Sequence, residues 1–177
     1  MVGTKQRGEL VRYDMKSHQF LPILSGISAT DPTFSRDGKW VVYTSSPDHT
    51  LWRSRSDGTE RMQLTFPPME VGFPIISPDG TKVAFFTHKG EQFVIGMEGG
   101  MPQRIDEKGV WASWSPDGNY LYYQIYGQYG GGGGVIADIR TGKKSAVPSS
   151  ENMFGFLAYP GHPDSPQHRA ENEVQDL

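Results

Sequence analysis

The chain carries three short runs of large apolar residues, and each run directly follows a polar turn. These runs cover residues 41–43 (VVY), 83–85 (VAF) and 121–123 (LYY). They do not alternate between apolar and polar positions, so each predicts a β-strand that is buried on both faces. No long window has the apolar spacing of an amphipathic helix, and only residues 167–177 have weak helical character. The pattern therefore predicts an all-β protein.

The turn before each run is nearly the same in all three copies. It reads Ser-Arg-Asp-Gly in the first copy and Ser-Pro-Asp-Gly in the other two. Aspartate can bond the backbone two residues on, and glycine accepts a positive φ, so both residues favour a tight turn. We expect a structural role in turns for six residues, namely Asp37, Gly38, Asp79, Gly80, Asp117 and Gly118.

A second pattern follows each run, and it consists of a strand, a tight turn and another strand. It covers residues 51–65, 93–105 and 135–147, and an earlier half copy covers residues 10–24. Strand, turn and strand in succession indicate a β-hairpin. The turn glycines are 42 residues apart from Gly38 to Gly80 and 38 apart from Gly80 to Gly118. A period near forty residues is the size of a four-stranded propeller blade.

Residues 10–148 resemble the WD40-like propeller repeat, which occurs in the TolB propeller and in the propellers of prolyl-oligopeptidase-type peptidases. The segments 31–38 (DPTFSRDG) and 111–118 (WASWSPDG) match this repeat best. The middle copy departs from it because Ile76 stands where an aromatic residue is usual, and in the first copy Arg36 replaces the turn proline. The resemblance implies a β-propeller.

The predicted fold is a partial, open propeller of about three and a half four-stranded antiparallel blades. We assign residues 1–28 to the last hairpin of a preceding blade and residues 29–66, 67–107 and 108–148 to three blades. Residues 149–177 are interpreted as a degenerate blade start and a disordered polar tail, because no further turn of the repeat follows residue 148. This break suggests a piece of a larger propeller protein.

Composition and charge narrow the range of functions. The formal net charge is −3, which argues against nucleic-acid binding because such proteins need an excess of lysine and arginine. There are no cysteines, so thiolate metal sites are excluded. The first nine residues are polar and lack a signal peptide, and no apolar stretch is long enough to insert into a membrane. The expected location is cytoplasmic as written, or periplasmic if the true N-terminus is missing.

Nothing in the sequence predicts an enzyme, a cofactor or a metal site. The glycine run at residues 130–134 and the segment 141–145 (TGKKS) only approach a phosphate-binding loop, because Lys144 stands where serine or threonine is needed. His162 and His168 do not have metal-ligand spacing. The turn serines recur because the fold repeats, and no nucleophile elbow is present.

Aromatic residues gather in the third repeat and form the most plausible ligand surface in the sequence. Most of them lie on predicted strands, so core packing is the expected role of Trp111, Trp114, Tyr120, Tyr122 and Tyr123. Tyr126 and Tyr129, beside the glycine run, are predicted to be exposed ligand contacts.

Three functions fit these observations. The first is a non-catalytic protein-binding or scaffolding module similar to TolB. The others are an accessory gating propeller of a prolyl-oligopeptidase-type peptidase and the sensory propeller of a larger bacterial regulator. Three and a half blades leave apolar faces bare. We therefore expect a protein partner or self-association through the open blade edges, either as a homodimer with a ring of about seven blades or as a poorly soluble product.

Overall fold

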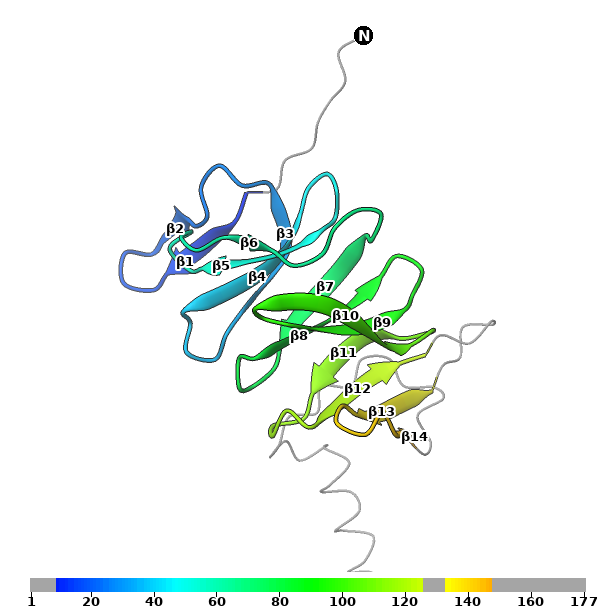
Figure 1. Ribbon diagram of the computed structural model, residues 1–177. Coiled ribbons are helices and arrows are strands. Elements are labelled where there is room, and N and C mark those ends of the chain that lie inside the picture. The colour runs from blue at the N-terminus through cyan, green and yellow to red at the C-terminus, as the bar shows by residue number, and fades with distance from the viewer. Residues whose placement is uncertain (1–8, 126–132, 148–177) are drawn as a thin grey trace, which may run out of the picture.

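The structure, a computed structural model, describes residues 9–125 and 133–147. These residues form fourteen β-strands, and no helix is present in the described parts of the chain. The strands build one two-stranded sheet and three four-stranded sheets, and every pairing is antiparallel. The predicted all-β propeller architecture is therefore confirmed, and the described array is open (Figure 1).

Each four-stranded sheet is a meander in which consecutive strands are neighbours. The first blade contains β3 (Ala29–Phe34), β4 (Trp40–Ser45), β5 (Leu51–Arg55) and β6 (Met62–Gln63). The second contains β7 (Val71–Ile76), β8 (Lys82–Thr87), β9 (Gln92–Gly96) and β10 (Gly99–Asp106). The third contains β11 (Val110–Trp114), β12 (Tyr120–Gln124), β13 (Gly134–Asp138) and β14 (Lys144–Ala146).

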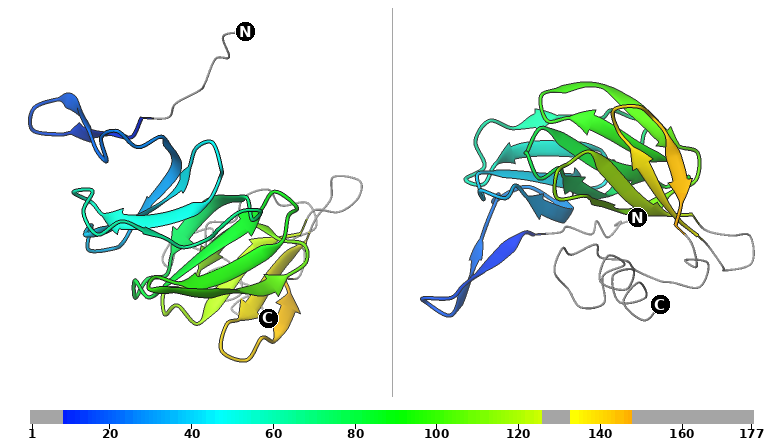
Figure 2. Two further views of the ribbon diagram at one scale, coloured as in Figure 1. Left: turned by 45° about the horizontal axis from the view of Figure 1, so that its top comes forward. Right: turned by 90° about the horizontal axis from the view of Figure 1, so that it is seen from below.

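A two-stranded hairpin precedes the first blade. It consists of β1 (Val11–Asp14) and β2 (Gln19–Pro22), with Tyr13 opposite Phe20 in the register. Both views in Figure 2 show this hairpin projecting away from the three blades, which are stacked face to face.

The blades are joined by three apolar clusters, one at each junction. The cluster between the hairpin and the first blade contains Leu10, Leu24 and Tyr43. The cluster between the first and second blades contains Val42 and Phe85. The cluster between the second and third blades contains Trp114 and Tyr123. The second strands of the first two blades, β4 and β8, thus have apolar neighbours on both faces, as the unbroken apolar runs predict, whereas β12 contributes Leu121 and Tyr123 to a single cluster.

The first strands of the blades lie closest together. β7 packs against β3 and β4, and β11 packs against β7 and β8. The first strands therefore converge on one side of the array, where a closed propeller has its central channel.

Candidate binding surface on the first strands

A repeated turn fixes the end of each first strand. In all three blades the serine Oγ donates to the aspartate two residues later at 2.6 Å, from Ser35 to Asp37, from Ser77 to Asp79 and from Ser115 to Asp117. The same Oγ accepts the N–H of the residue that begins the second strand, at 2.9 Å in each blade. Gly38, Gly80 and Gly118 have φ of 70°, 73° and 70°, a conformation in which a residue with a side chain would be strained.

The hydrogen bonds of this turn lower the pKa of its carboxyl group. Asp79 has its pKa lowered to about 2, first by the hydroxyl of Ser77 and then by the backbone N–H of Thr81. Asp117 also has a pKa of about 2, and the largest cause is the hydroxyl of Ser115. A carboxylate that accepts several hydrogen bonds is favoured in its charged form. These carboxylates therefore accept hydrogen bonds from backbone N–H groups of their own turns.

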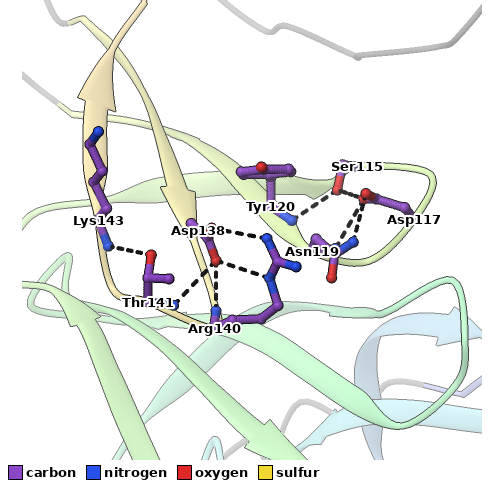
Figure 3. A network of polar contacts seen from close by, with 8 residues as sticks. All are labelled: Ser115, Asp117, Asn119, Tyr120, Asp138, Arg140, Thr141 and Lys143. Carbon is purple, nitrogen blue, oxygen red and sulfur yellow. Dashed lines mark hydrogen bonds and ion pairs between the residues drawn. The ribbon is translucent and has the colours of Figure 1, made fainter.

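Figure 3 shows the third copy of this turn beside a second aspartate turn. Asn119 donates its backbone N–H to Asp117 at 3.0 Å. Asp138, at the end of β13, accepts the backbone N–H groups of Arg140 and Thr141 at 2.9 and 3.2 Å. The Ile139 N–H donates to the Asn119 carbonyl at 3.0 Å, so the two turns are joined. The polar side chains at this end of the blade therefore hold the turns in place.

Each first strand contains a bulge at the same position of the repeat. The register with the second strand shifts between Thr30 and Thr33 in β3, between Gly72 and Ile75 in β7, and between Val110 and Ser113 in β11. Inside each bulge one residue other than glycine has a positive φ, and these residues are Asp31 (51°), Phe73 (48°) and Trp111 (48°). Each lies seven residues before the turn glycine of its repeat.

This conformation is costly for such residues. A left-handed φ is a genuine outlier for a bulky side chain, and it is retained where the surrounding structure determines it. Bulges re-aim side chains and are frequent next to functional sites. The same bulge with a left-handed residue recurs in three successive repeats, which makes the first strands a candidate binding surface.

Two of the three bulge residues present large aromatic rings to solvent. Phe73 is 55% exposed and Trp111 is 42% exposed, whereas Asp31 is half-buried. The Phe73 ring stacks on that of Phe86, with centroids 5.5 Å apart and planes within 12°. Aromatic side chains held by their neighbours supply large contact area at low entropic cost, as the anchors of interfaces do.

Hydrogen bonds between blades hold this surface rigid. The Thr33 hydroxyl of β3 donates to the carbonyl of Pro74 in β7 at 2.6 Å. From the other side, the Trp114 indole N–H of β11 donates to the carbonyl of Ile75 in β7 at 3.2 Å. Pro74 lies within the β7 bulge and Ile75 lies at its end, so the strand that carries Phe73 is fixed by both neighbours.

The start of β7 is fixed by a cluster of polar groups. The Val71 N–H donates to the carbonyl of His49 at 2.7 Å. The His88 Nδ1 lies 2.9 Å from the Glu70 carboxylate, and the rings of His88 and His49 are 5.1 Å apart. This cluster joins the β4–β5 and β8–β9 turns to the strand that leads to Phe73.

The structure places the candidate residues from the sequence as follows. Asp37, Asp79 and Asp117 lie in the turns, whereas Tyr126, Tyr129 and the glycine run up to residue 132 lie outside the described residues. Within residues 9–125 and 133–147, no group of three His, Asp or Glu side chains is placed to hold a metal ion. The same part of the chain contains no helix that is long and apolar enough to span a membrane.

The expectation that the third-repeat aromatics fill the core is wrong at two positions. Trp114, Tyr122 and Tyr123 are buried, but Trp111 and Tyr120 are exposed. Sequence reasoning missed Trp111 because a tryptophan on an apolar strand indicates burial, and the bulge that turns it outward is a tertiary feature. The aligned repeats do contain one signal, because Trp111, Asp31 and Phe73 each lie seven residues before the turn glycine of their repeat.

The fold and the arrangement of its strands define a segment of a β-propeller, and comparisons with known proteins agree. No protein-family model matches the chain. Among curated proteins, an uncharacterized protein of Agrobacterium fabrum is 30% identical over 114 residues, which is 54% of this chain and 39% of that protein. Tricorn protease homolog 1 of Streptomyces coelicolor is 33% identical over 129 residues, or 69% of this chain and 11% of that protein. The chain thus spans less than half of either relative.

Solved structures of several propeller proteins, TolB among them, show the same fold. A structure designated TolB from Agrobacterium tumefaciens matches with a TM-score of 0.64 at 18% identity, covering 84% of this chain and 56% of that one. A chain of the nidogen/laminin complex gives a TM-score of 0.63 at 12% identity, over 80% of this chain and 59% of that one. Oligogalacturonate lyase in complex with manganese gives 0.64 at 17% identity, over 78% of this chain and 47% of that one. The chain has a TolB-like propeller fold.

Proposed function

We propose that the chain is a non-catalytic, protein-binding propeller module whose contact surface is formed by the bulged first strands. The observation that carries this proposal is the repeated positive φ at Asp31, Phe73 and Trp111, which turns two aromatic rings toward solvent on adjoining strands. Exposed aromatic side chains on a rigid support are the anchors that protein interfaces favour.

The serines and aspartates that recur in all three repeats are used in the turns. Ser35, Ser77 and Ser115 each donate to an aspartate and accept a backbone N–H, so the hydroxyls are engaged. The fold itself decides nothing about catalysis, because oligogalacturonate lyases share it. A protein partner has a precedent in the nidogen/laminin complex.

Site-specific crosslinking tests the proposal. A photoreactive phenylalanine analogue is placed at Phe73 or at Trp111 in the native host, with Ile136 of β13, which is 40% exposed, as the control position. We expect the same protein to be captured from both first-strand positions and not from Ile136. The purified partner should then bind the double variant Phe73→Ala/Trp111→Ala at least about tenfold more weakly, since aromatic anchors contribute about 2 kcal/mol or more. Equal capture from Ile136, or unchanged affinity, would refute the proposal.

A second candidate is an accessory propeller that gates access in a peptidase. The similarity to Tricorn protease homolog 1 of Streptomyces coelicolor favours it. The same crosslinking experiment separates the two candidates, because a gating propeller would be captured on a peptidase domain. Peptide hydrolysis by that complex would then change when Phe73 and Trp111 are replaced, whereas a binding module would have no effect on hydrolysis.

A further inference from the structure

The β1–β2 hairpin is the second half of a blade. The Ile23 N–H donates to the Leu10 carbonyl at 2.8 Å, just as Leu64 donates to Leu51 and Val147 donates to Gly134 in the complete blades, also at 2.8 Å. Leu10 is therefore equivalent to Leu51. By the same alignment β1 corresponds to β5, β2 corresponds to β6, and Arg12 is equivalent to Arg53.

The equivalent strands differ in their neighbours. β5 lies between β4 and β6, whereas β1 pairs with β2 alone among the described strands. Hydrogen-bonded pairs alternate along an antiparallel ladder, so the bond to Leu10 implies that the N–H and C=O of Val11 and Tyr13 face the free edge. A free edge of this kind is a template for another strand.

The junction between the first and second blades shows how a complete blade closes. Arg53, only 7% exposed, lies over the Trp40 ring with its guanidinium carbon 4.4 Å from the centroid. It donates to Glu98 in the β9–β10 turn of the next blade at 2.9 Å. Beside this pair Met62 reaches Gly99 so closely that a Cβ at Gly99 would lie 3.0 Å from the end of its side chain.

The junction between the hairpin and the first blade has the same charged positions but is open. Arg12 is exposed, and Asp57 takes the place of Glu98 in the equivalent β5–β6 turn. Both side chains line a cavity of about 620 Å³, together with Arg61 and the apolar residues Ile23 and Leu24. Among the described residues this junction has no counterpart of Trp40, because Trp40 begins the second strand of its blade and only the third and fourth strands of the hairpin's blade are described.

Besides the free edge of β1 and the cavity, an exposed aromatic ring on β3 lies on the same side of the array. Phe34, directly before the turn serine, is 44% exposed, whereas its equivalents Ile76 and Trp114 pack into the clusters with the preceding blade. Phe34 faces the side where the first two strands of the hairpin's blade would be. The free edge, the open cavity and this exposed ring thus mark one surface on the N-terminal side of the array.

We propose that this surface binds a β-hairpin made of the first two strands of a propeller repeat, with an aromatic residue at the start of its second strand. That strand pairs with β1 through Val11 and Tyr13. Its aromatic residue stacks on Arg12 as Trp40 stacks on Arg53, and Arg12 turns toward Asp57 as Arg53 does toward Glu98. The inference does not depend on the proposed function, because Phe73 and Trp111 have no part in it.

The chain itself supplies the probe. A fluorescein-labelled peptide of residues 29–45 contains β3, the turn and β4, which form the first half of the first blade. Fluorescence anisotropy with the full chain should give saturable binding of one peptide per chain. The peptide with Trp40→Ala should bind at least about tenfold more weakly, since it cannot form the desolvated cation–π contact with Arg12. Equal binding of both peptides, or none by the first, would overturn the proposal.

Variants of the protein locate the binding site. Val11→Pro removes an N–H that faces the free edge and leaves the hairpin bonds of Leu10 intact, so it should abolish binding. Arg12→Glu should weaken binding at least about tenfold, and Lys89→Glu, an exposed charge reversal in the β8–β9 turn, should leave it unchanged. Thermal unfolding shows whether each variant is folded. If the peptide binds Val11→Pro and Arg12→Glu normally, it exchanges with β3 and β4 instead, which contradicts the proposal. Dimerisation that Arg12→Glu abolishes and the peptide cannot compete with would identify a second copy as the occupant, and would also contradict it.

Discussion

Two neighbouring strands of the second blade, β8 and β7, differ in burial and in the regularity of their pairing. β8 keeps an unbroken register with β9, and its residues Val83, Ala84 and Phe85 are at most 1% exposed. β7 breaks its register at a bulge and turns Phe73 outward with a positive φ. The strands share one set of ladder bonds, yet one is a regular core element and the other is a strained surface element. The core and the proposed binding surface are therefore separated by a single strand spacing.

The largest effect should come from the core position of β8. Phe85→Ala removes a buried ring that stacks on Phe93 with centroids 5.7 Å apart, and it should lower the free energy of unfolding by about 3–5 kcal/mol. The matched control is Phe73→Ala on β7, whose ring is half in solvent and should contribute less than about 1 kcal/mol. Urea denaturation of both variants measures the contrast, and similar losses would contradict the division.

The next effect concerns the link between blades two and three. The Tyr123 hydroxyl donates to Asp106 at 2.6 Å, and Lys144 reaches the same carboxylate at 2.8 Å. Tyr123→Phe should lower the free energy of unfolding by about 1–3 kcal/mol, because a partly buried carboxylate loses a donor.

Alkaline titration provides an independent measurement of this link. Burial and the Asp106 carboxylate raise the pKa of Tyr123 in the folded state. Stability from this group is fully present below about pH 10, the ordinary tyrosine value, and falls as the pH rises above it. The stability of Tyr123→Phe should fall less steeply there, and an identical alkaline slope would count against the hydrogen bond.

A smaller effect is expected at the turn that ends β7. Ser77→Ala removes the donor to Asp79 and the acceptor for the Lys82 N–H, and it should lower the free energy of unfolding by about 1–2 kcal/mol at neutral pH. The folded pKa of Asp79, about 2, lies below its ordinary value of 3.8. The stabilisation is therefore present above about pH 4 and is lost as the pH falls toward 2.

Stability measured between pH 2 and 6 provides the test. The wild-type protein should lose stability more steeply on acidification than Ser77→Ala, because the variant has already lost the bond that depresses the pKa. Ser54→Ala, a change of a buried serine outside the turns, is the control and should keep the wild-type slope. Parallel acid profiles for wild type and Ser77→Ala would show that the turn serine does not set the pKa of Asp79.

The same contrast explains what the sequence could predict. β4, β8 and β12 are apolar on both faces, so local patterning alone indicates buried strands, and the turns follow from the chemistry of aspartate and glycine. The outward turn of Phe73 and Trp111 depends on bulges in the first strands, and at the β7 bulge the Pro74 carbonyl accepts a bond from Thr33 of the neighbouring blade. No local pattern contains that information. The open cavity at Arg12 likewise appears only when one junction is compared with the next.

The smallest and sharpest change is Phe73→Gly. Glycine adopts φ of 48° without the cost of about 1–2 kcal/mol that a side chain incurs there, and it loses about 0.5–1 kcal/mol through greater freedom when unfolded. The ring removed is half exposed, so the free energy of unfolding should stay within about 1 kcal/mol of wild type. The control Ile75→Gly, in the same strand at a position with no positive φ, should lose clearly more than that. A Phe73→Gly variant as stable as wild type that no longer binds the partner would show that the ring at this position serves recognition and not stability. A large loss of stability would mean that Phe73 belongs to the core, and the division between β7 and β8 would be wrong.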